Sequence, residues 1–468
     1  MGTGIAAFFA DRQIPVTLYD VSVDLAKKAI EKAADPSNKV PILMSGRAAA
    51  LITPRSVEDY AGNLDQCDII VEAVPEILSL KKKVYDAIER FRKPGSLVCT
   101  NTSGLSVDAM AEGRSEDFRK NFLGTHFFNP VRFMQLIEVI PGKDTSPDVV
   151  QNVMMQLKMM GKKPVLAKDT PNFIANRIGI YGMMKTLKLM QKYGFSVEDI
   201  DAITGEPLGN AKSATFRTAD LVGIDTLAHV AQNALENAKT EDEKQTFAAP
   251  AWLKTMLEKK MLGDKTGGGF YKKTGGGKGG DDDAPKAKSE ILTLDVEKLE
   301  YRKKIDARHD AIRVAKGYSK PADRVVATLT YGDEDKVSQF ARELVLSLGA
   351  YALSLTGEIA DDARAIDEAV KLGFGKDVGP IEALDALGAA RAKKMMERIG
   401  VPVPAVLAAA AAENASLLPK AEENGTISLS RLRSAPGKVV RENLNARLVD
   451  LGDQVLLCEL DAKMVPSM

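Results

Sequence analysis

The sequence predicts an α/β domain with a mostly parallel sheet, followed by two related all-α domains. Over residues 1–168, short buried strand patterns alternate with helix patterns, as right-handed crossovers between parallel strands require. Strand patterns give way to long helical ones near Asp169, and part of the first helical region recurs later in the chain. These three observations predict one sheet-containing domain and one duplicated helical domain.

The α/β part is predicted to begin with an apolar helix at residues 3–10 and a buried strand at Val16–Asp20. A helix therefore precedes the first strand of this domain. The other elements expected here are helices at 26–34 and 80–91 and strands at 69–73, 97–100, 121–126 and 136–140.

The first helical domain is predicted over residues 169–272, because apolar residues there recur at helical spacing. Gly-rich and Asp-rich sequence follows, and such a composition cannot form a core. We therefore predict a flexible linker over 273–300. The helices expected in the first helical domain lie at 175–193, 226–237 and 251–259.

The second helical domain is predicted over 301–412 as a copy of the first. Glu198–Asp201 and Ala219–Gly223 are echoed by Arg364–Asp367 and Leu384–Gly388 at a nearly constant offset. A hairpin near the end of the chain is too small to be stable by itself. The elements expected in this half are helices at 335–355, 389–399 and 405–412, a polar connector at 413–447, and a hairpin at 448–460 in a final segment, 448–468.

Composition excludes several classes of protein. Lys plus Arg and Asp plus Glu number 64 each in 468 residues, so no net field favours nucleic acid or an anionic membrane. No apolar run reaches the length of a membrane span and no signal-peptide pattern is present, so a cytoplasmic location is predicted. Cys67, Cys99 and Cys458 have no metal-ligand spacing, and we expect three small core residues with neither a disulfide nor a metal site.

The N-terminal segment has the spacing of a dinucleotide site. Gly2 and Gly4 open the first helix, and Asp20 ends the next strand at about the distance at which the dinucleotide fingerprint places its ribose-binding acid. The same small residues also suit a helix that merely packs on a sheet. Both interpretations stay open from these residues alone.

The strongest chemical signal is a histidine and an acid on neighbouring strands. His126, one of three histidines, ends a buried strand, and Glu138 lies in the strand that follows. A carboxylate against an imidazole fixes its tautomer and stabilises its charged form, which makes the histidine an effective base. A core histidine satisfied by a neighbouring acid would show the same spacing.

Three motifs in order resemble those of the 3-hydroxyacyl-CoA dehydrogenase family: Asn101–Ser103, His126–Pro130 with Glu138, and Asp169–Arg177. The resemblance covers residues 1–271 and implies a Rossmann-like NAD-binding domain over 1–168. The later repeat resembles the duplicated helical domain of the multifunctional and long-chain members.

The resemblance also implies roles for individual residues. His126 and Glu138 would be the catalytic pair, and Ser103 and Asn176 would position the substrate. For Lys81 a solvated helix face, and for Lys265 a structural role, remain equally good explanations. The residues implied to bind the cofactor are Gly2, Asp20, Glu76, Lys81, Asn129 and Lys265.

The implied function is NAD-dependent oxidation of (S)-3-hydroxyacyl-CoA to 3-oxoacyl-CoA in fatty-acid β-oxidation, with His126 as the base. An acyl-CoA thioester would be the substrate, and dimerisation through the helical domain is a family expectation. Two alternatives stay open. One is a dehydrogenase of small hydroxy acids, a class that typically relies on a lysine base, and the other is a non-catalytic interaction module that has lost cofactor binding.

The sequence departs from the family at both ends. Relatives carry a strand and a Gly-x-Gly turn before the residues that match Met1 and Gly2, so the sheet is expected to lack its first, central strand and the chain to bind NAD poorly. The terminal hairpin resembles the opening strands of an enoyl-CoA hydratase module, and hydratase activity is not expected. The second helical repeat has no His–Glu pair and is expected to pack or to line the acyl channel.

Overall fold

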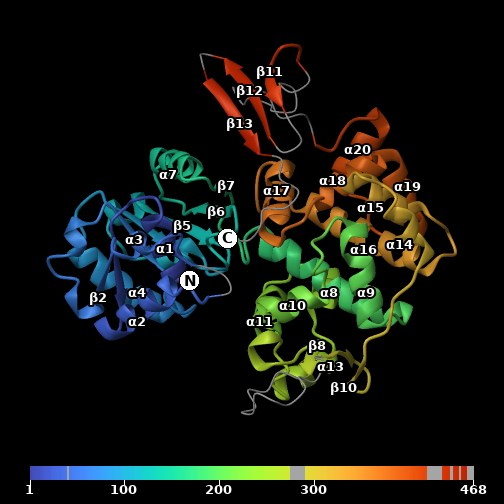
Figure 1. Cartoon of the computed structure of the whole chain (residues 1–468), viewed down its shortest axis with the longest axis horizontal. Helices are drawn as coiled ribbons and strands as arrows, with labels where there is room; N and C mark the ends of the chain where they lie inside the picture. Colours follow the sequence, from blue (N-terminus) through green and yellow to red (C-terminus); the bar gives the residue numbers. More distant parts are fainter. Residues whose placement is uncertain (39–41, 275–289, 419–434, 443–445, 453–454, 461–468) are drawn as a thin grey trace. The chain divides into compact units, whose positions relative to one another are not determined.

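A computed structural model describes residues 1–38, 42–274, 290–418, 435–442, 446–452 and 455–460 (Figure 1). The chain divides into two compact units, Met1–Leu418 and Pro419–Met468. The first unit contains the α/β part and both helical repeats. The division therefore falls a few residues beyond 412, where the sequence predicted the end of the second helical domain.

The α/β part contains two sheets rather than one. Parallel strands β1 (Val16–Asp20) and β2 (Ile52–Ser56) form the smaller sheet. Among the described residues β1 does not pair with the first strand of the larger sheet, and the break lies where the sequence predicted a missing central strand. The larger sheet has the order β3 (Ile69–Glu72), β4 (Leu97–Thr100), β5 (Phe122–Phe127), β6 (Leu136–Pro141) and β7 (Lys163–Leu166).

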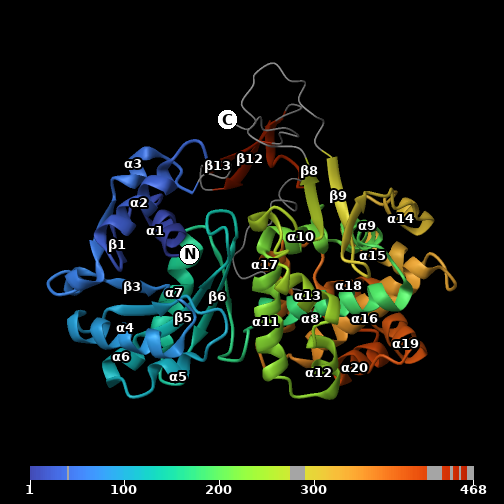
Figure 2. The ribbon, with the colours of Figure 1, turned by 90° about the horizontal axis from the view of Figure 1, so that it is seen from below.

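All pairings in the larger sheet are parallel except that between β5 and β6. Both faces are covered (Figure 2), and β5 and β6 are accordingly buried along almost their whole length. One face packs against α4 (Leu78–Phe91), α5 (Val107–Ala111) and α6 (Glu116–Lys120), and the other against α1 (Gly2–Ala10) and α7 (Pro147–Met159).

Predicted elements of this part agree with the structure to within three residues at either end. Two strands were missed, because β2 and β7 each carry a proline, which disfavours a strand prediction. The remaining elements here are α2 (Val23–Ala34), α3 (Gly46–Ala49) and the 3-10 helices η1 (Val57–Asp59) and η2 (Leu64–Gln66).

The first helical repeat is organised around the long helix α8 (Ala175–Tyr193), which has the bounds predicted from the sequence. Ten of its residues are buried, because helices of both repeats pack around it. The others are α9 (Val197–Thr204), η3 (Glu206–Leu208), α10 (Phe216–Val222), α11 (Ile224–Glu236), α12 (Glu241–Phe247), α13 (Ala251–Glu258) and η4 (Asp264–Thr266).

The predicted linker, 273–300, contains regular structure. Strands β8 (Tyr271–Thr274), β9 (Glu290–Asp295) and β10 (Glu300–Lys303) form an antiparallel sheet, and residues 275–289 lie outside the described part of the chain. Thr293 and Leu294 of β9 are buried, so the linker prediction is wrong for 290–300. Composition averaged over the Gly-rich run concealed a short strand that has two consecutive buried residues.

The second helical repeat copies the first in its hydrogen bonding. Asp201 accepts the backbone N–H groups of Phe216 and Arg217 at the start of α10, and Asp367 accepts those of Ile381 and Glu382 at the start of α18. The predicted duplication is therefore confirmed. The helices of this repeat are α14 (Asp310–Ala315), α15 (Pro321–Thr330), α16 (Lys336–Ser354), α17 (Ala363–Phe374), α18 (Pro380–Leu387), α19 (Ala389–Ile399) and α20 (Ala405–Glu413).

A buried arginine joins the two repeats. Arg177 of α8 donates to Glu243 of α12 and to the Tyr351 hydroxyl of α16 at 3.0 and 3.1 Å. It also bonds Glu358, just beyond α16, at 2.9 Å. Because α16 packs along α8, the repeats share one core rather than forming separate bodies.

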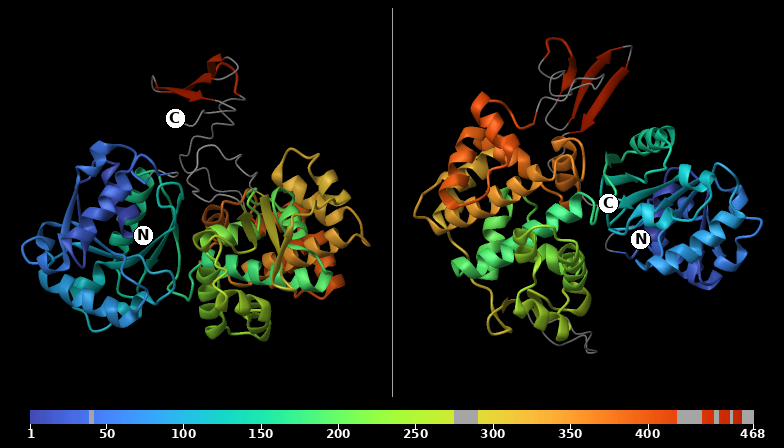
Figure 3. Two further views of the ribbon diagram at one scale, coloured as in Figure 1. Left: turned by 60° about the horizontal axis from the view of Figure 1, so that its bottom comes forward. Right: turned by 180° about the vertical axis from the view of Figure 1, so that it is seen from behind.

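The second unit is a three-stranded antiparallel sheet, drawn in red in Figure 3. Its strands are β11 (Val439–Glu442), β12 (Ala446–Gly452) and β13 (Val455–Leu460). The predicted hairpin is present, and residues 453–454 lie outside the described part of the chain. Residues 439–442 and 446–447, predicted as connector, belong to strands instead.

Cysteine burial differs from the prediction of three core residues. Cys99 is buried, but Cys67 is only partly buried and Cys458 is exposed on β13. All three are free thiols. In the part of the chain that the structure describes, no cluster of His, Cys, Asp and Glu could hold a metal ion, and no helix is long and apolar enough to cross a membrane.

Candidate active site

The site is built on a direct contact between His126 and Glu138. The two residues stand opposite each other in the antiparallel pairing of β5 with β6. The His126 Nδ1 atom lies 2.6 Å from the Glu138 Oε2 atom, and the two side chains are 6% and 0% exposed. Because side chains of opposed residues lie on the same face of a sheet, the strand register itself creates this pair.

The second carboxylate oxygen of Glu138 is held by the start of α8. The backbone N–H groups of Ile174 and Ala175 donate to Oε1 at 3.1 and 2.8 Å. The helix dipole also favours a negative charge at this end. Asn172 and Phe173 turn the chain into the helix with φ of 62° and 49°, a strained conformation of the kind that collects at functional sites.

Two aromatic rings flank the His126 imidazole. The ring centroids of Phe128 and Phe173 lie 4.4 and 5.8 Å from that of the imidazole. Phe173 is fully buried and Phe128 partly so. With one ring nitrogen held by Glu138 and two rings against its sides, His126 has a fixed orientation.

Ser103 and Asn176, predicted to position the substrate, are brought together. The Asn176 side-chain amide lies 3.5 Å from the Ser103 backbone carbonyl oxygen, at the edge of hydrogen-bonding distance. The loop that carries Ser103 follows β4, and its Asn101 side chain accepts the Phe127 backbone N–H at 2.9 Å. This bond ties the loop to the residue after His126.

Glu76 and Lys81 lie beside this loop in a polar cluster. Glu76 accepts the Ser103 backbone N–H at 2.8 Å and also binds the buried Thr102 hydroxyl. Burial would raise the pKa of Glu76, but Lys81 and these two hydrogen bonds outweigh it and lower that pKa. Lys81 is fully buried, so the alternative of a solvated helix face is wrong for this residue.

Sequence reasoning missed three residues of this region. Glu72 ends β3 and is 3% exposed, and it binds Lys81, which also contacts Glu76. Phe128 and Phe173 flank the imidazole. The signal for Glu72 was present, since a charged residue inside an apolar strand requires a buried partner.

The predicted cofactor residues at the N-terminus have a suitable local arrangement. Gly2 is the first residue of α1, and Asp20 ends the adjacent strand β1. A Cβ on Gly4 would stand 3.2 Å from Val131 Cγ2, so this glycine permits close packing of the helix. A bare helix start beside an acid at a strand end fits the phosphates and the ribose of a dinucleotide.

The other two predicted cofactor residues lie in different parts of the chain. Asn129 is exposed next to the His126 strand and precedes a cis peptide bond to Pro130. Lys265 belongs to η4 of the helical part and forms an ion pair with Asp225 of α11. Its described contact is therefore with the helical repeat rather than with the residues around His126.

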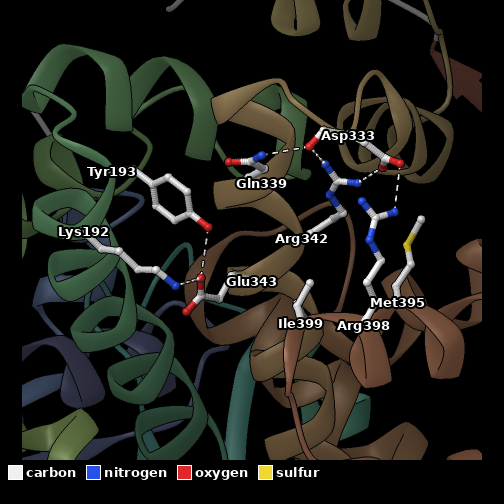
Figure 4. Close-up of a pocket in the computed structure, with 9 residues that line it drawn as sticks. All are labelled: Lys192, Tyr193, Asp333, Gln339, Arg342, Glu343, Met395, Arg398 and Ile399. Atoms are coloured by element: carbon white, nitrogen blue, oxygen red, sulfur yellow. Dashed lines mark hydrogen bonds and ion pairs between the residues drawn. The ribbon is translucent and has the colours of Figure 1, made fainter.

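A separate pocket of about 300 Å³ lies at the far end of α8 (Figure 4). Lys192 and the Tyr193 hydroxyl both donate to Glu343, at 2.5 and 3.1 Å, and Arg342 and Arg398 both bind Asp333. The contacts of Glu343 join α8 of the first repeat to α16 of the second, whereas the two Asp333 ion pairs lie within the second repeat. The pocket is lined by charged side chains of both repeats and is distinct from the His126 site.

A mostly parallel sheet that carries a buried His–Glu pair on two neighbouring strands, followed by a helical part, is the architecture of two-part nucleotide-binding dehydrogenases. Residues 1–170 match the family described as 3-hydroxyacyl-CoA dehydrogenase, NAD binding domain, and residues 173–273 match its C-terminal domain. The chain belongs to the 3-hydroxyacyl-CoA dehydrogenase family.

Curated relatives agree. A probable 3-hydroxyacyl-CoA dehydrogenase of Bacillus subtilis (strain 168) is 39% identical over 99% of this chain and 61% of its own length. A protein of the same description from Deinococcus radiodurans is 40% identical over 58% of this chain and 79% of its own length. The chain thus spans less than two thirds of the Bacillus relative.

Solved structures show the same fold. The 3-hydroxybutyryl-CoA dehydrogenase of Escherichia coli K12 superposes with a TM-score of 0.63 at 20% identity, covering 88% of this chain and 96% of its own. FadB2 of M. tuberculosis gives a TM-score of 0.51 at 25% identity, covering 58% and 95%. The E. coli structure includes the region of the second repeat, and at its identity the likeness concerns the fold alone.

Proposed function

We propose that the chain oxidises the 3-hydroxyl of an (S)-3-hydroxyacyl-CoA to the 3-oxo compound, with NAD as the acceptor. The observation that carries the proposal is the buried His126–Glu138 pair, held by the start of α8 and adjoining the Ser103 and Asn176 contact. The acyl-CoA substrate class and dimerisation through the helical part rest on the family.

His126 acts as the base. Its Nδ1 atom is taken by Glu138, so Nε2 is the ring nitrogen that accepts the proton of the substrate hydroxyl. The imidazolium that forms is stabilised by the Glu138 carboxylate, which is itself held by two backbone N–H groups. The hydroxyl proton passes to Nε2, the hydrogen on the same carbon leaves as a hydride, and a carbon–oxygen double bond forms.

Positioning falls to the residues around the imidazole. The Ser103 hydroxyl and the Asn176 amide hold the substrate oxygen toward His126, which converts binding energy into alignment. Asp20 and the α1 start at Gly2 would hold the dinucleotide, with Glu76 and Lys81 along it and Asn129 and Lys265 nearer its reacting end. When bound, NAD supplies the acceptor for the hydride on the substrate carbon.

The test compares (S)-3-hydroxybutyryl-CoA with free (S)-3-hydroxybutyrate at millimolar NAD, so that weak cofactor binding does not conceal turnover. We expect NADH formation with the thioester and a rate at least about 100-fold lower with the free acid. Equal rates would point to a dehydrogenase of small hydroxy acids.

His126→Ala tests the assignment of the base. Loss of a general base lowers kcat by roughly 10²–10⁴-fold, and the Kd for NAD should not change. His229→Ala is the matched control, since this histidine is exposed on α11. Unchanged turnover in the His126 variant would reject the assignment.

A further inference from the structure

Lys162 is a buried ammonium group that binds carbonyl oxygens. It directly precedes β7 and is 6% exposed. Its Nζ atom donates to the backbone carbonyl oxygens of Val131 and Met134 at 2.5 and 2.6 Å. Among the described residues no carboxylate forms an ion pair with it. A buried charge costs free energy unless strong partners replace water, so the two carbonyls must be held firmly by this side chain.

The charge of Lys162 is also supported by the first helix. Burial, with a smaller contribution from Arg12, lowers the pKa of Lys162 to about 8, so the group is still mostly protonated at pH 7. Its Nζ atom stands 4.7 Å from the centre of the Phe8 ring of α1, a distance at which a cation is attracted by the ring face. Hydrogen bonds from a charged donor are stronger than those from a neutral one. Lys162 therefore binds both α1 and the carbonyls.

The two carbonyls belong to the turn Pro130–Met134, which joins β5 to β6. The N–H groups of its last two residues both donate to the carbonyl oxygen of its first residue, at 3.0 Å. Lys162 adds two further bonds to the same short segment. In the proposed function Asn129, which immediately precedes this turn, lies nearer the reacting end of NAD.

The turn and the end of β5 pack against α1. A Cβ on Gly4 would stand 3.2 Å from Val131 Cγ2, so the turn approaches the start of this helix closely. The Phe8 ring meets the Phe127 ring of β5 edge to face, with the centroids 5.8 Å apart. Because Lys162 contacts both Phe8 and the Val131 carbonyl, it lies where α1, the turn and the end of β5 meet.

We propose that Lys162 is a positioning residue that holds the Pro130–Met134 turn against α1. It thereby fixes Asn129 and the end of β5, where His126 stands, relative to the helix start that would hold the dinucleotide. The inference rests on the proposed function, because this alignment matters when a hydride passes from the substrate to NAD. Lys162 acts on the reaction only through the turn.

Loss of the ammonium group should release the turn. A methionine at position 162 fills similar space but donates no hydrogen bond, so the Val131 and Met134 carbonyls lose their partner. The turn then moves toward water to satisfy them, and Asn129 moves with it. The contact between Ser103 and Asn176, which would hold the substrate, involves neither α1 nor the turn. Alignment should therefore suffer while substrate affinity is retained.

The first test needs no activity. Hydrogen exchange of the Phe133 and Met134 amides is measured in the whole chain for wild type and Lys162→Met, with Lys163→Met as the matched control because this neighbouring lysine is exposed. We expect exchange of the two amides to be at least about fivefold faster in Lys162→Met, with α16 and the control unchanged. Unchanged exchange in the turn, or faster exchange throughout the chain, overturns the proposal.

The second test separates positioning from a purely structural role. In Lys162→Met, kcat for (S)-3-hydroxybutyryl-CoA, extrapolated to saturating NAD, should fall about tenfold, while KM for the thioester stays within about twofold of wild type. A residue that only stabilises the fold would lower the melting temperature and leave kcat of the folded chain unchanged. That result, or a raised KM with unchanged kcat, overturns the proposal.

Failure of the proposed function gives a different result. A wild-type chain without turnover rejects that function, whereas faster exchange in the turn of Lys162→Met still supports the role of Lys162 in holding the turn. Should Lys162→Met not fold, Lys162→Gln replaces it, because its shorter amide reaches at most one of the two carbonyls. Exchange in the turn should then be about twofold faster, and unchanged exchange in a folded Lys162→Gln contradicts the proposal.

Discussion

Gly373 of α17, in the second helical repeat, lies directly against Ala175, the first residue of α8. A Cβ at position 373 would stand 3.0 Å from the Ala175 Cβ and 3.3 Å from the Phe128 ring. Ala175 donates to Glu138, and Phe128 packs on His126. The second helical repeat, which has no His–Glu pair of its own, therefore packs against the residues that hold His126 and Glu138 in place.

We expect Gly373→Val to lower kcat by roughly tenfold. A branched side chain needs space that Ala175 and Phe128 now fill, and either shift misaligns the imidazole. Gly349→Ala is the control, since its new Cβ would stand 2.6 Å from Leu384 inside the second repeat. The control should lose melting temperature but keep kcat at 25 °C; equal loss of kcat in both variants would indicate a general packing defect.

We expect Glu138→Gln to fold but to lose activity by roughly 10²–10³-fold. The amide oxygen can still accept from Ile174 and Ala175, while the amide nitrogen donates to His126 Nδ1 and forces the proton onto Nε2. A ring nitrogen that already carries a proton cannot accept one from the substrate. Steady-state kcat measures the loss of activity, and the melting temperature shows whether the variant is folded. A kcat within threefold of wild type contradicts the assigned tautomer.

Arg177→Met is expected to destabilise the chain by about 3–5 kcal/mol. The substitution leaves Glu243 buried without its cation, and the Glu243 side chain is 5% exposed. Urea unfolding at pH 7 measures the loss. The double variant with Glu243→Gln should recover part of it, because no uncompensated charge remains; a double variant less stable than the sum of both single changes would refute this account.

Stability should depend on pH through Asp367. Burial raises the pKa of this carboxyl to about 6, against 3.8 in an unfolded chain, although two backbone hydrogen bonds oppose the shift. Between these values the folded chain binds the proton and the unfolded chain does not. The Asp367 contribution to stability is therefore full below pH 4 and is lost as pH rises through 6.

Urea unfolding of wild type and Asp367→Asn between pH 4.5 and 7.5 tests this sign. The free energy of unfolding of wild type, relative to the variant, should fall by roughly 1–3 kcal/mol over that range. A difference that grows with pH would show that the hydrogen bonds outweigh burial. Asp385→Asn, at a partly exposed carboxylate in the same repeat, is the control.

The contact between His126 and Glu138 could be predicted because its cause is local in the sequence. His126 and Glu138 lie on strands joined by a short connection, so antiparallel pairing places them opposite each other. The helix α8 could be predicted to the residue because its apolar spacing is long and regular. The duplication could be predicted because Asp201 and Asp367 are each followed, at similar spacing, by the glycine that ends the next helix, Gly223 or Gly388.

The strand β9 and the burial of Lys81 could not be predicted, because both depend on contacts between separate elements. Strand β9 is ordered by β8 and β10, on either side of a Gly-rich run. Lys81 stands in a run of three lysines, and only the approach of β3 to α4 places it between two carboxylates.

By itself the sequence determined the α/β and helical division, the duplication and the pairing of His126 with Glu138, since these follow from local periodicity and from motifs. Tertiary structure alone decided which charges are buried, which repeat supports the imidazole through Gly373, and how Glu72 is linked to Ser103. Burial and close approach arise when separate elements pack, and a pattern along the chain does not contain the distances between elements.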